Sequence, residues 1–284
     1  MTNCLEVEHL YKSFPLFSLE DVNFVLPEGA IMGFVGENGA GKTTTIKLIL
    51  DLLKKDSGAI RIFGNESVDI STKSEIGAVL SDGFFPDNMN PAQIAKVMHC
   101  IYHNFDQHRF EQYCSDFQLP MKKNVKDFST GMKMKCKLAT ALAHNPKLLI
   151  LDEPTSGLDP IVRNEILDIF LDYIQDESKS ILFSSHITDD LEKIADYITF
   201  IHSGRIVFSD SKDEIMDHYK ILKCGRGNLP DAYRSQVLFK KENQFGCEYL
   251  IKNRQQVSTM ENIPVVDPAS LDDIMLFYAK GARV

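Results

Sequence analysis

The chain has 284 residues, of which 44% are hydrophobic and 25% are charged, a composition typical of a soluble protein with one large domain, or one domain and an appendage. Its formal net charge of −9 disfavours general binding to nucleic acid, because neutralising phosphates requires clustered lysine and arginine. No apolar run reaches the roughly 18–20 residues of a membrane span, no signal peptide is visible, and the six cysteines form no CxxC pair, so we expect a cytoplasmic chain with reduced thiols.

Short apolar stretches in the first 80 residues predict β-strands. They cover residues 5–10, 19–26, 30–35, 59–63 and 76–80. A helix is predicted from residue 42 to about 53, where apolar residues recur every three or four positions. The stretch from about 87 to 127 is polar and has helical spacing after Pro91, so we interpret it as a small helical insert.

Strands and helices alternate in the second half of the chain. The predicted helices cover residues 132–143, 162–174 and 189–195, and the predicted strands cover 148–151 and 180–185, with a hairpin at 198–202 and 205–208. Such alternation implies a largely parallel sheet with both faces covered. Beyond about Lys223 the pattern weakens to strand pieces at 237–239 and 249–251 and a closing helix at 270–279, which predicts an accessory element.

A phosphate-binding motif follows the predicted strand at 30–35 and opens the next helix. It fits the pattern G-x-x-x-x-G-K-[ST] and consists of Gly36, Glu37, Asn38, Gly39, Ala40, Gly41, Lys42 and Thr43. The glycines let the backbone curl so that several N–H groups point at phosphates, and the helix N-terminus adds a positive dipole. Lys42 is expected to reach the β- and γ-phosphates, and the Thr43 hydroxyl group to bind Mg²⁺. ATP and Mg²⁺ are therefore the predicted ligands.

Two carboxylates end the apolar strand at 148–151. Asp152 is placed to hold the magnesium shell, and Glu153 to polarise a water for attack on the γ-phosphate. Taken alone, two acids at a strand exit are common in α/β proteins. Beside a phosphate-binding loop, the catalytic interpretation is favoured.

A serine and a glycine precede the predicted helix at 132–143. Ser129, Thr130 and Gly131 at a helix start can form a second small anion site, and a bound phosphate would offset the unfavourable lysines that follow. The alternative is an N-capped helix with a solvated lysine face.

Taken together, these motifs resemble those of ABC transporter ATP-binding subunits. The phosphate loop through Thr44, the Ser129–Gly131 segment, the sequence LLILDEPTSGLDP and the SSH at 184–186 occur in the family's order and at similar spacings, over roughly residues 3–220. The resemblance implies an α/β fold: a P-loop NTPase core of largely parallel sheet, with an N-terminal antiparallel β part, a helical subdomain insert and a small C-terminal accessory element. We expect the ATP-binding domain at 1–222, its helical subdomain at about 84–143, and the accessory region at 223–284.

Further roles follow from the resemblance alone. ATP would lie between the phosphate loop of one subunit and residues 129–131 of a second ATP-binding subunit, identical or homologous. Asp159 would belong to the loop that links the two sites, and His186 would contact the γ-phosphate and act in catalysis with Glu153 and Lys42. Phe14 falls where the family stacks a tyrosine on adenine, with Tyr11 a less favoured substitute.

The sequence departs from the family pattern at two places. The signature reads FSTGMK, with Met132 where a glutamine is usual, and this variant most resembles exporters whose membrane partner is of the ABC-2 type. Ser81 and Asp82 stand where a glutamine is expected after the strand at 76–80. Either side chain carries an oxygen that can approach Mg²⁺ or the attacking water.

These features predict an ATP-hydrolysing motor subunit of a membrane ABC transporter. We expect it at the cytoplasmic face of the membrane, driving a separate transmembrane subunit that exports a peptide, drug or similar amphipathic substrate. Apolar side chains in or just before the helical insert either dock on that partner or pack in the core, namely Phe84, Phe85, Met89, Met98 and Phe105. Two alternatives are a soluble ABC protein acting on ribosomes or DNA, and a nucleotide-binding regulator with degenerate hydrolysis.

Overall fold

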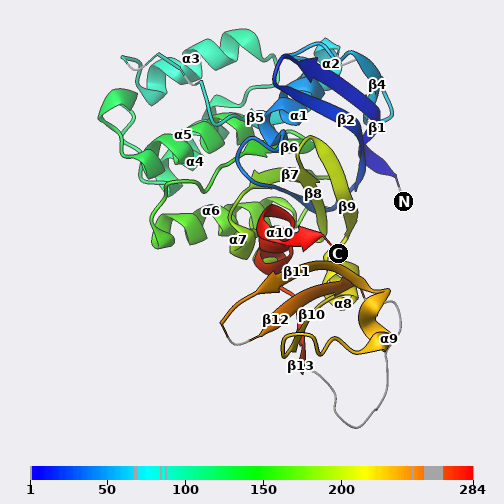
Figure 1. Ribbon diagram of the computed structural model, residues 1–284. Coiled ribbons are helices and arrows are strands. Elements are labelled where there is room, and N and C mark those ends of the chain that lie inside the picture. Colours follow the sequence, from blue (N-terminus) through cyan, green and yellow to red (C-terminus); the bar gives the residue numbers. More distant parts are fainter. Residues whose placement is uncertain are drawn as a thin grey trace. The chain divides into compact units, whose positions relative to one another are not determined.

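The computed structural model describes residues 2–66, 69–83, 85–86, 88–244, 246–252 and 265–283 and divides the chain into two compact units (Figure 1). The first unit is Met1–Ser209 and the second is Asp210–Val284. The division falls earlier than the expected 222/223, because helix α8 (Lys212–His218) leads into strand β10 (Tyr219–Cys224), which pairs with later strands. Within the described residues, no helix combines the length and the apolar character needed to cross a membrane.

The N-terminal part of the first unit is an antiparallel sheet of three strands. Its order is β2 (Phe17–Pro27), β1 (Asn3–Phe14) and β4 (Ser57–Ile62). Val7 pairs with Phe24 on one side and with Ile60 on the other. All three side chains are buried in the main core cluster, which confirms the expected antiparallel part.

The larger sheet of the first unit has six strands, five of them joined by parallel pairing. Its order is β5 (Ile76–Val79), β6 (Leu148–Asp152), β7 (Ser180–Ser185), β3 (Ile31–Val35), β8 (Tyr197–His202) and β9 (Arg205–Ser211). Every side chain of β3, β6 and β7 is buried, which is why these strands appear as uninterrupted apolar runs in the sequence. The parallel pairing brings Asp152 opposite Ser184, and Val35 opposite Ser185, at one edge. The segments that follow these strands therefore meet in space.

Helices connect these strands. The ranges are α1 (Lys42–Ile49), α2 (Ile70–Ser74), α6 (Pro160–Tyr173) and α7 (Thr188–Ile194). Helix α1 ends before the predicted residue 53. The chain leaves the helix because Asp51 adopts a left-handed conformation with a φ of 56°.

The predicted helical insert consists of α3 (Pro91–Ile101), α4 (Gln107–Asp116), the short 3₁₀ helix η1 (Val125–Asp127) and α5 (Thr130–Leu142). These elements share a core of their own around Phe110, Cys114 and Cys136, which are fully buried. Met98 and Phe105 belong to that core, at 8% and 4% exposure, so core packing accounts for them rather than docking on a partner. Phe85 and Met89 are partly buried against it, and Phe84 lies outside the described residues.

The second unit is a five-stranded sheet with short helices. Its order is β13 (Val265–Pro268), β10, β12 (Cys247–Lys252), β11 (Val237–Glu242) and β14 (Ala282–Arg283), and it carries α9 (Asp231–Arg234) and α10 (Leu271–Lys280). The sequence predicted parts of β11, β12 and α10 but not β10, β13 or α8. Those elements are short, and β13 forms only four residue pairs with β10.

A buried ion pair connects α6 with α7, close to the sheet edge described above. Asp190 is fully buried, and its Oδ1 lies 2.5 Å from Nε of Arg163, whose side chain is 24% exposed.

We expect Asp190→Ala to lower the free energy of unfolding by about 2 kcal/mol, because the guanidinium group would lose its partner while still partly buried. Chemical denaturation measures this. The exposed neighbour provides a control: Asp189→Ala should change stability by less than about 0.5 kcal/mol, and equal effects of the two variants would contradict the prediction.

Candidate active site

The phosphate loop runs from the end of β3 to the start of α1, and its glycines are required by their surroundings. A Cβ atom on Gly36 would lie 2.5 Å from the carbonyl oxygen of Ile201. Gly41 has a φ of +116°, and a Cβ atom there would lie 2.6 Å from the side chain of Leu19. These positions therefore exclude larger residues, and the loop has the tight shape that its sequence predicts.

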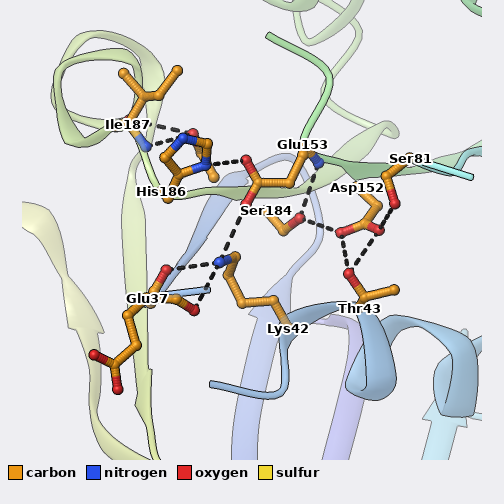
Figure 2. Close-up of polar contacts among 11 residues, drawn as sticks. Glu37, Lys42, Thr43, Ser81, Asp152, Glu153, Ser184, His186 and Ile187 are labelled. Carbon is orange, nitrogen blue, oxygen red and sulfur yellow. Dashed lines mark hydrogen bonds and ion pairs between the residues drawn. The ribbon is translucent and has the colours of Figure 1, made fainter. Parts of the chain in front are cut away.

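Lys42, the first residue of α1, points back into the curve of this loop (Figure 2). Its side chain is only 5% exposed. The Nζ atom donates to the carbonyl oxygens of Gly36 at 2.7 Å and Glu37 at 3.2 Å, and lies 3.2 Å from Oε1 of Glu153. A buried ammonium group at the first residue of a helix, beside the phosphate loop, is suited to bind an anion.

Asp152, the last residue of β6, is fully buried and is surrounded by hydroxyl groups (Figure 2). Its carboxylate accepts hydrogen bonds from Thr43 at 2.9 Å, Ser81 at 2.7 Å and Ser184 at 2.8 Å. Carboxylate and hydroxyl oxygens are ligands that Mg²⁺ prefers, and the cluster lies beside the phosphate loop. The residues thus fit the divalent ion that the sequence predicts.

Glu153 connects the phosphate-loop lysine with the histidine of the SSH motif (Figure 2). Its Oε2 lies 2.6 Å from Nδ1 of His186, while its Oε1 is the atom beside Lys42. The backbone of Glu153 is left-handed, with a φ of 54°, and its N–H group is held by the carbonyl oxygen of Ser184 at 3.1 Å. Such a conformation is costly for a residue with a side chain and is typical of active sites. A carboxylate oriented in this way can act as a general base.

A cavity of about 760 Å³ in the first unit is lined by three of the residues described above, namely Ser81, Glu153 and His186. Its wall includes residues from the phosphate loop, from the segments that follow β5, β6 and β7, from η1 and from α5. Asn38, Thr130 and Lys137 also line it. The structure thus brings together most of the predicted catalytic and metal-binding residues.

Of the two residues in the expected glutamine position, Ser81 hydrogen-bonds to Asp152 and Asp82 does not. The carboxylate of Asp82 accepts a hydrogen bond from Lys47 on α1 at 2.9 Å, and this contact holds the pKa of Asp82 below its ordinary value. Asp82 therefore lies outside the cluster around Asp152, and its approach to Mg²⁺ stays a prediction. Consecutive residues after a strand point in different directions, so only one of them faces the cluster.

The remaining predicted residues lie at the ends of helices. Ser129 caps α5 by accepting from the N–H group of Met132 at 3.2 Å, and it is exposed, as is Thr130. A Cβ atom on Gly131 would lie 2.9 Å from the side chain of Val162, so a larger residue here would displace that side chain. Asp159 caps α6 by accepting from the N–H groups of residues 161 and 162, both at 3.1 Å.

Ser184 is a functional residue that the sequence reasoning missed. Its hydroxyl group donates to Asp152 and accepts from the N–H group of Glu153 at 3.1 Å, so it fixes both carboxylate residues. The signal was the hydroxyl residue in SSH at the end of a buried apolar strand, where no solvent can satisfy it.

Phe14 lies at the β1–β2 turn on the wall of a second cavity, of about 570 Å³, which it shares with Glu37, Asn38 and Gly39 of the phosphate loop. The residue is 38% exposed. Phe14 is therefore near enough to the loop to stack on a base. Tyr11 is similarly exposed, at 39%, but does not line this cavity.

We expect Phe14→Ala to weaken ATP binding about tenfold, because stacking of a base on an aromatic ring contributes about 1–3 kcal/mol. Titration with a fluorescent ATP analogue measures the change. Tyr11→Ala removes an aromatic ring of similar exposure outside the cavity and should leave the affinity unchanged. A larger loss in Tyr11→Ala than in Phe14→Ala would assign the stacking role to Tyr11.

Comparison with known proteins agrees with this geometry. The family described as ABC transporter matches residues 19–156, which include the phosphate loop, Asp152 and Glu153. The lantibiotic transport ATP-binding protein SrtF of Streptococcus pyogenes is 33% identical over 240 residues, covering 84% of this chain and 99% of that protein. The chain belongs to the ABC transporter ATP-binding family. It is an ATP-binding subunit that hydrolyses ATP to drive a membrane transporter.

Other relatives of this ABC ATPase have similar names. The bacitracin transport ATP-binding protein BcrA of Bacillus licheniformis is 36% identical, covering 72% of this chain and 66% of that protein. A solved ATP-binding subunit of an ABC transporter is 28% identical, with a TM-score of 0.68, covering 75% of this chain and 92% of that one. The relatives are transport proteins, which favours the transporter interpretation over a protein acting on ribosomes or DNA.

Proposed function

We propose that this ABC ATPase is the motor of an exporter, works as a head-to-tail dimer around ATP and Mg²⁺, and acts at the cytoplasmic face of the membrane. The observation that carries the ATPase site is the position of Glu153 between Lys42 and His186.

The hydroxyl group of Thr43 and the carboxylate of Asp152 would hold Mg²⁺, and the hydroxyl group of Ser81 would face it. Thr43 and Ser81 each already donate a hydrogen bond to the carboxylate of Asp152. When bound, the ion would neutralise charge on the phosphates of ATP. Ser184 would keep the carboxylate of Asp152 in place from the opposite strand.

Hydrolysis would depend on an exchange of partners at Glu153. The ammonium group of Lys42 faces Glu153 at 3.2 Å. A γ-phosphate in the loop competes for that ammonium group, which releases one carboxylate oxygen to accept a proton from the attacking water. His186 would hold the other oxygen and orient the carboxylate, as it does at 2.6 Å here.

The dimer is supported by what the monomer leaves exposed. Ser129 and Thr130 start a helix of 13 residues, whose N-terminus can accept a phosphate from a second copy or a homologous subunit. Asp159 caps the start of α6, and Val162 in the first turn of that helix lies close to Gly131. Each ATP would thus be held by two subunits.

The membrane partner would be a separate transmembrane chain, and nucleic acid would not be a partner. The substrate would be a peptide, drug or similar amphipathic compound, because relatives named for lantibiotic and bacitracin transport share about a third of their residues with this chain. Purification of the chain from its native membrane tests this. A co-purifying protein with several membrane spans supports the proposal, whereas co-purifying ribosomes would contradict it.

A further inference from the structure

Three consecutive residues after strand β5 are each attached to a different element of the first unit. The Nζ atom of Lys137 on α5 donates to the carbonyl oxygen of Leu80 at 2.9 Å. Ser81 donates to Asp152 at 2.7 Å, and Asp82 accepts from Lys47 on α1 at 2.9 Å. The segment 80–82 therefore joins the helical part, the buried carboxylate and the helix of the phosphate loop.

Lys137 is not part of a solvated lysine face. Its side chain is partly buried, and burial lowers its pKa while Asp82 opposes that change. It lines both the catalytic cavity and a neighbouring cavity of about 290 Å³ that also contacts Leu80, Asp82 and Gly83. Lys135, by contrast, pairs with Glu165 on α6 at 2.6 Å. The lysines of α5 thus have different surroundings.

We propose that Lys137 is a positioning residue for ATP hydrolysis: it holds the Leu80 carbonyl so that the hydroxyl group of Ser81 meets Asp152. Leu80 and Ser81 share one peptide group, so fixing the carbonyl of Leu80 fixes the start of Ser81. Gly83 follows with a φ of +81° and lets the chain turn away, so side-chain contacts set the position of the segment. This inference rests on the proposed role of Ser81 beside Mg²⁺.

Lys137 would couple the position of helix α5 to that of Ser81. Helix α5 carries both Lys137 and, at its start, Thr130, which follows Ser129 of the proposed dimer contact. A displacement of α5 would therefore move the Leu80 carbonyl, and with it Ser81, through one side chain. The charged donor makes this hydrogen bond stronger than a neutral one.

Lys137→Met tests the contact, because methionine keeps much of the stem and removes the donor. In the nucleotide-free protein, amide hydrogen exchange at residues 81–83 should become about tenfold faster. The affinity for a fluorescent ATP analogue is measured once with Mg²⁺ and once with EDTA, and the ratio of the two affinities is the Mg²⁺ effect. In Lys137→Met this ratio should fall about fivefold, while the affinity measured with EDTA should stay unchanged. Lys137→Arg, which keeps a cationic donor, should recover most of both effects. The exposed Lys123 gives the control Lys123→Met, which should change neither quantity.

A double-mutant cycle with Ser81→Ala separates this inference from the proposed function. If Lys137 acts through Ser81, Lys137→Met should not reduce the effect of Mg²⁺ further in the Ser81→Ala background. A normal exchange rate and a normal Mg²⁺ effect in Lys137→Met, with a reduced Mg²⁺ effect in Ser81→Ala, would overturn the role of Lys137 alone. Equal losses from Lys137→Met in both backgrounds would also overturn it. If Ser81→Ala leaves the Mg²⁺ effect unchanged, the metal role of Ser81 is refuted. Faster amide exchange in Lys137→Met would then still support the positioning contact.

Discussion

Glu153→Gln should lower ATP turnover by at least about 100-fold while ATP still binds, because general-base catalysis contributes about 10²–10⁴ in rate. The amide has nearly the same shape, but it cannot accept a proton from water. It also removes the negative charge that faces Lys42 at 3.2 Å, so affinity for ATP should stay the same or rise. Steady-state phosphate release and a nucleotide titration measure the two quantities.

The same variant should also accumulate an ATP-bound dimer, since the subunits would close around ATP and fail to hydrolyse it. Size-exclusion chromatography with light scattering, with and without ATP and Mg²⁺, detects this species. Glu177→Gln makes the same chemical change on an exposed surface and should behave as the unmodified protein. Normal turnover in Glu153→Gln would remove Glu153 from the role of base, and a strictly monomeric variant would contradict the dimer.

Lys42→Ala should weaken ATP binding by about 10–100-fold, because a hydrogen bond to a charged group contributes about 1.5–3 kcal/mol. The side chain is 5% exposed and lies inside the loop, so no other lysine can readily replace it. Removing it also leaves Oε1 of Glu153 without its neighbouring cation. ATP hydrolysis should therefore be lost together with ATP binding. Isothermal titration with ATP and Mg²⁺ measures the affinity.

Lys54→Ala provides the control for this loss, since Lys54 is exposed beyond the end of α1. Its substitution removes one positive charge outside the loop and should leave the affinity within about twofold of the original. Circular dichroism establishes that both variants are folded. A folded Lys42→Ala protein that binds ATP normally would refute the phosphate-loop assignment.

The comparison of Ser81 with Asp82 shows where prediction from the sequence stopped. Both carry oxygen, both stand where the family has a glutamine, and nothing in their order says which faces the metal site. In the structure Ser81 donates to Asp152, whereas Asp82 accepts from Lys47, and Lys137 donates to the carbonyl oxygen of Leu80. Neither lysine could be paired with these residues from the sequence, because they lie on α1 and α5, 35 and 57 positions away.

The accessory region gives a second example. Strand β10 and helix α8 were assigned to no predicted element, and the domain boundary was expected at 222/223 instead of at Ser209. A short strand is defined by its partners, and the partners of β10 are β12 and β13, whose sequences lie farther along the chain. The last described helix, α10, was predicted because its apolar residues are periodic within one segment.

The sequence by itself determined the phosphate loop, the strand that ends in Asp152 and Glu153, and the helical insert, because each depends on residues close together in the chain. Glycine spacing, apolar runs and helical periodicity are local, and local patterns can be read without knowing the fold. Only the tertiary structure decided that Ser184 fixes both carboxylate residues, that Glu153 contacts both Lys42 and His186, and that Ser81 rather than Asp82 meets Asp152. These contacts follow from the register of the parallel strands, which places the ends of β5, β6, β7 and β3 at one edge although their residues are far apart in the sequence.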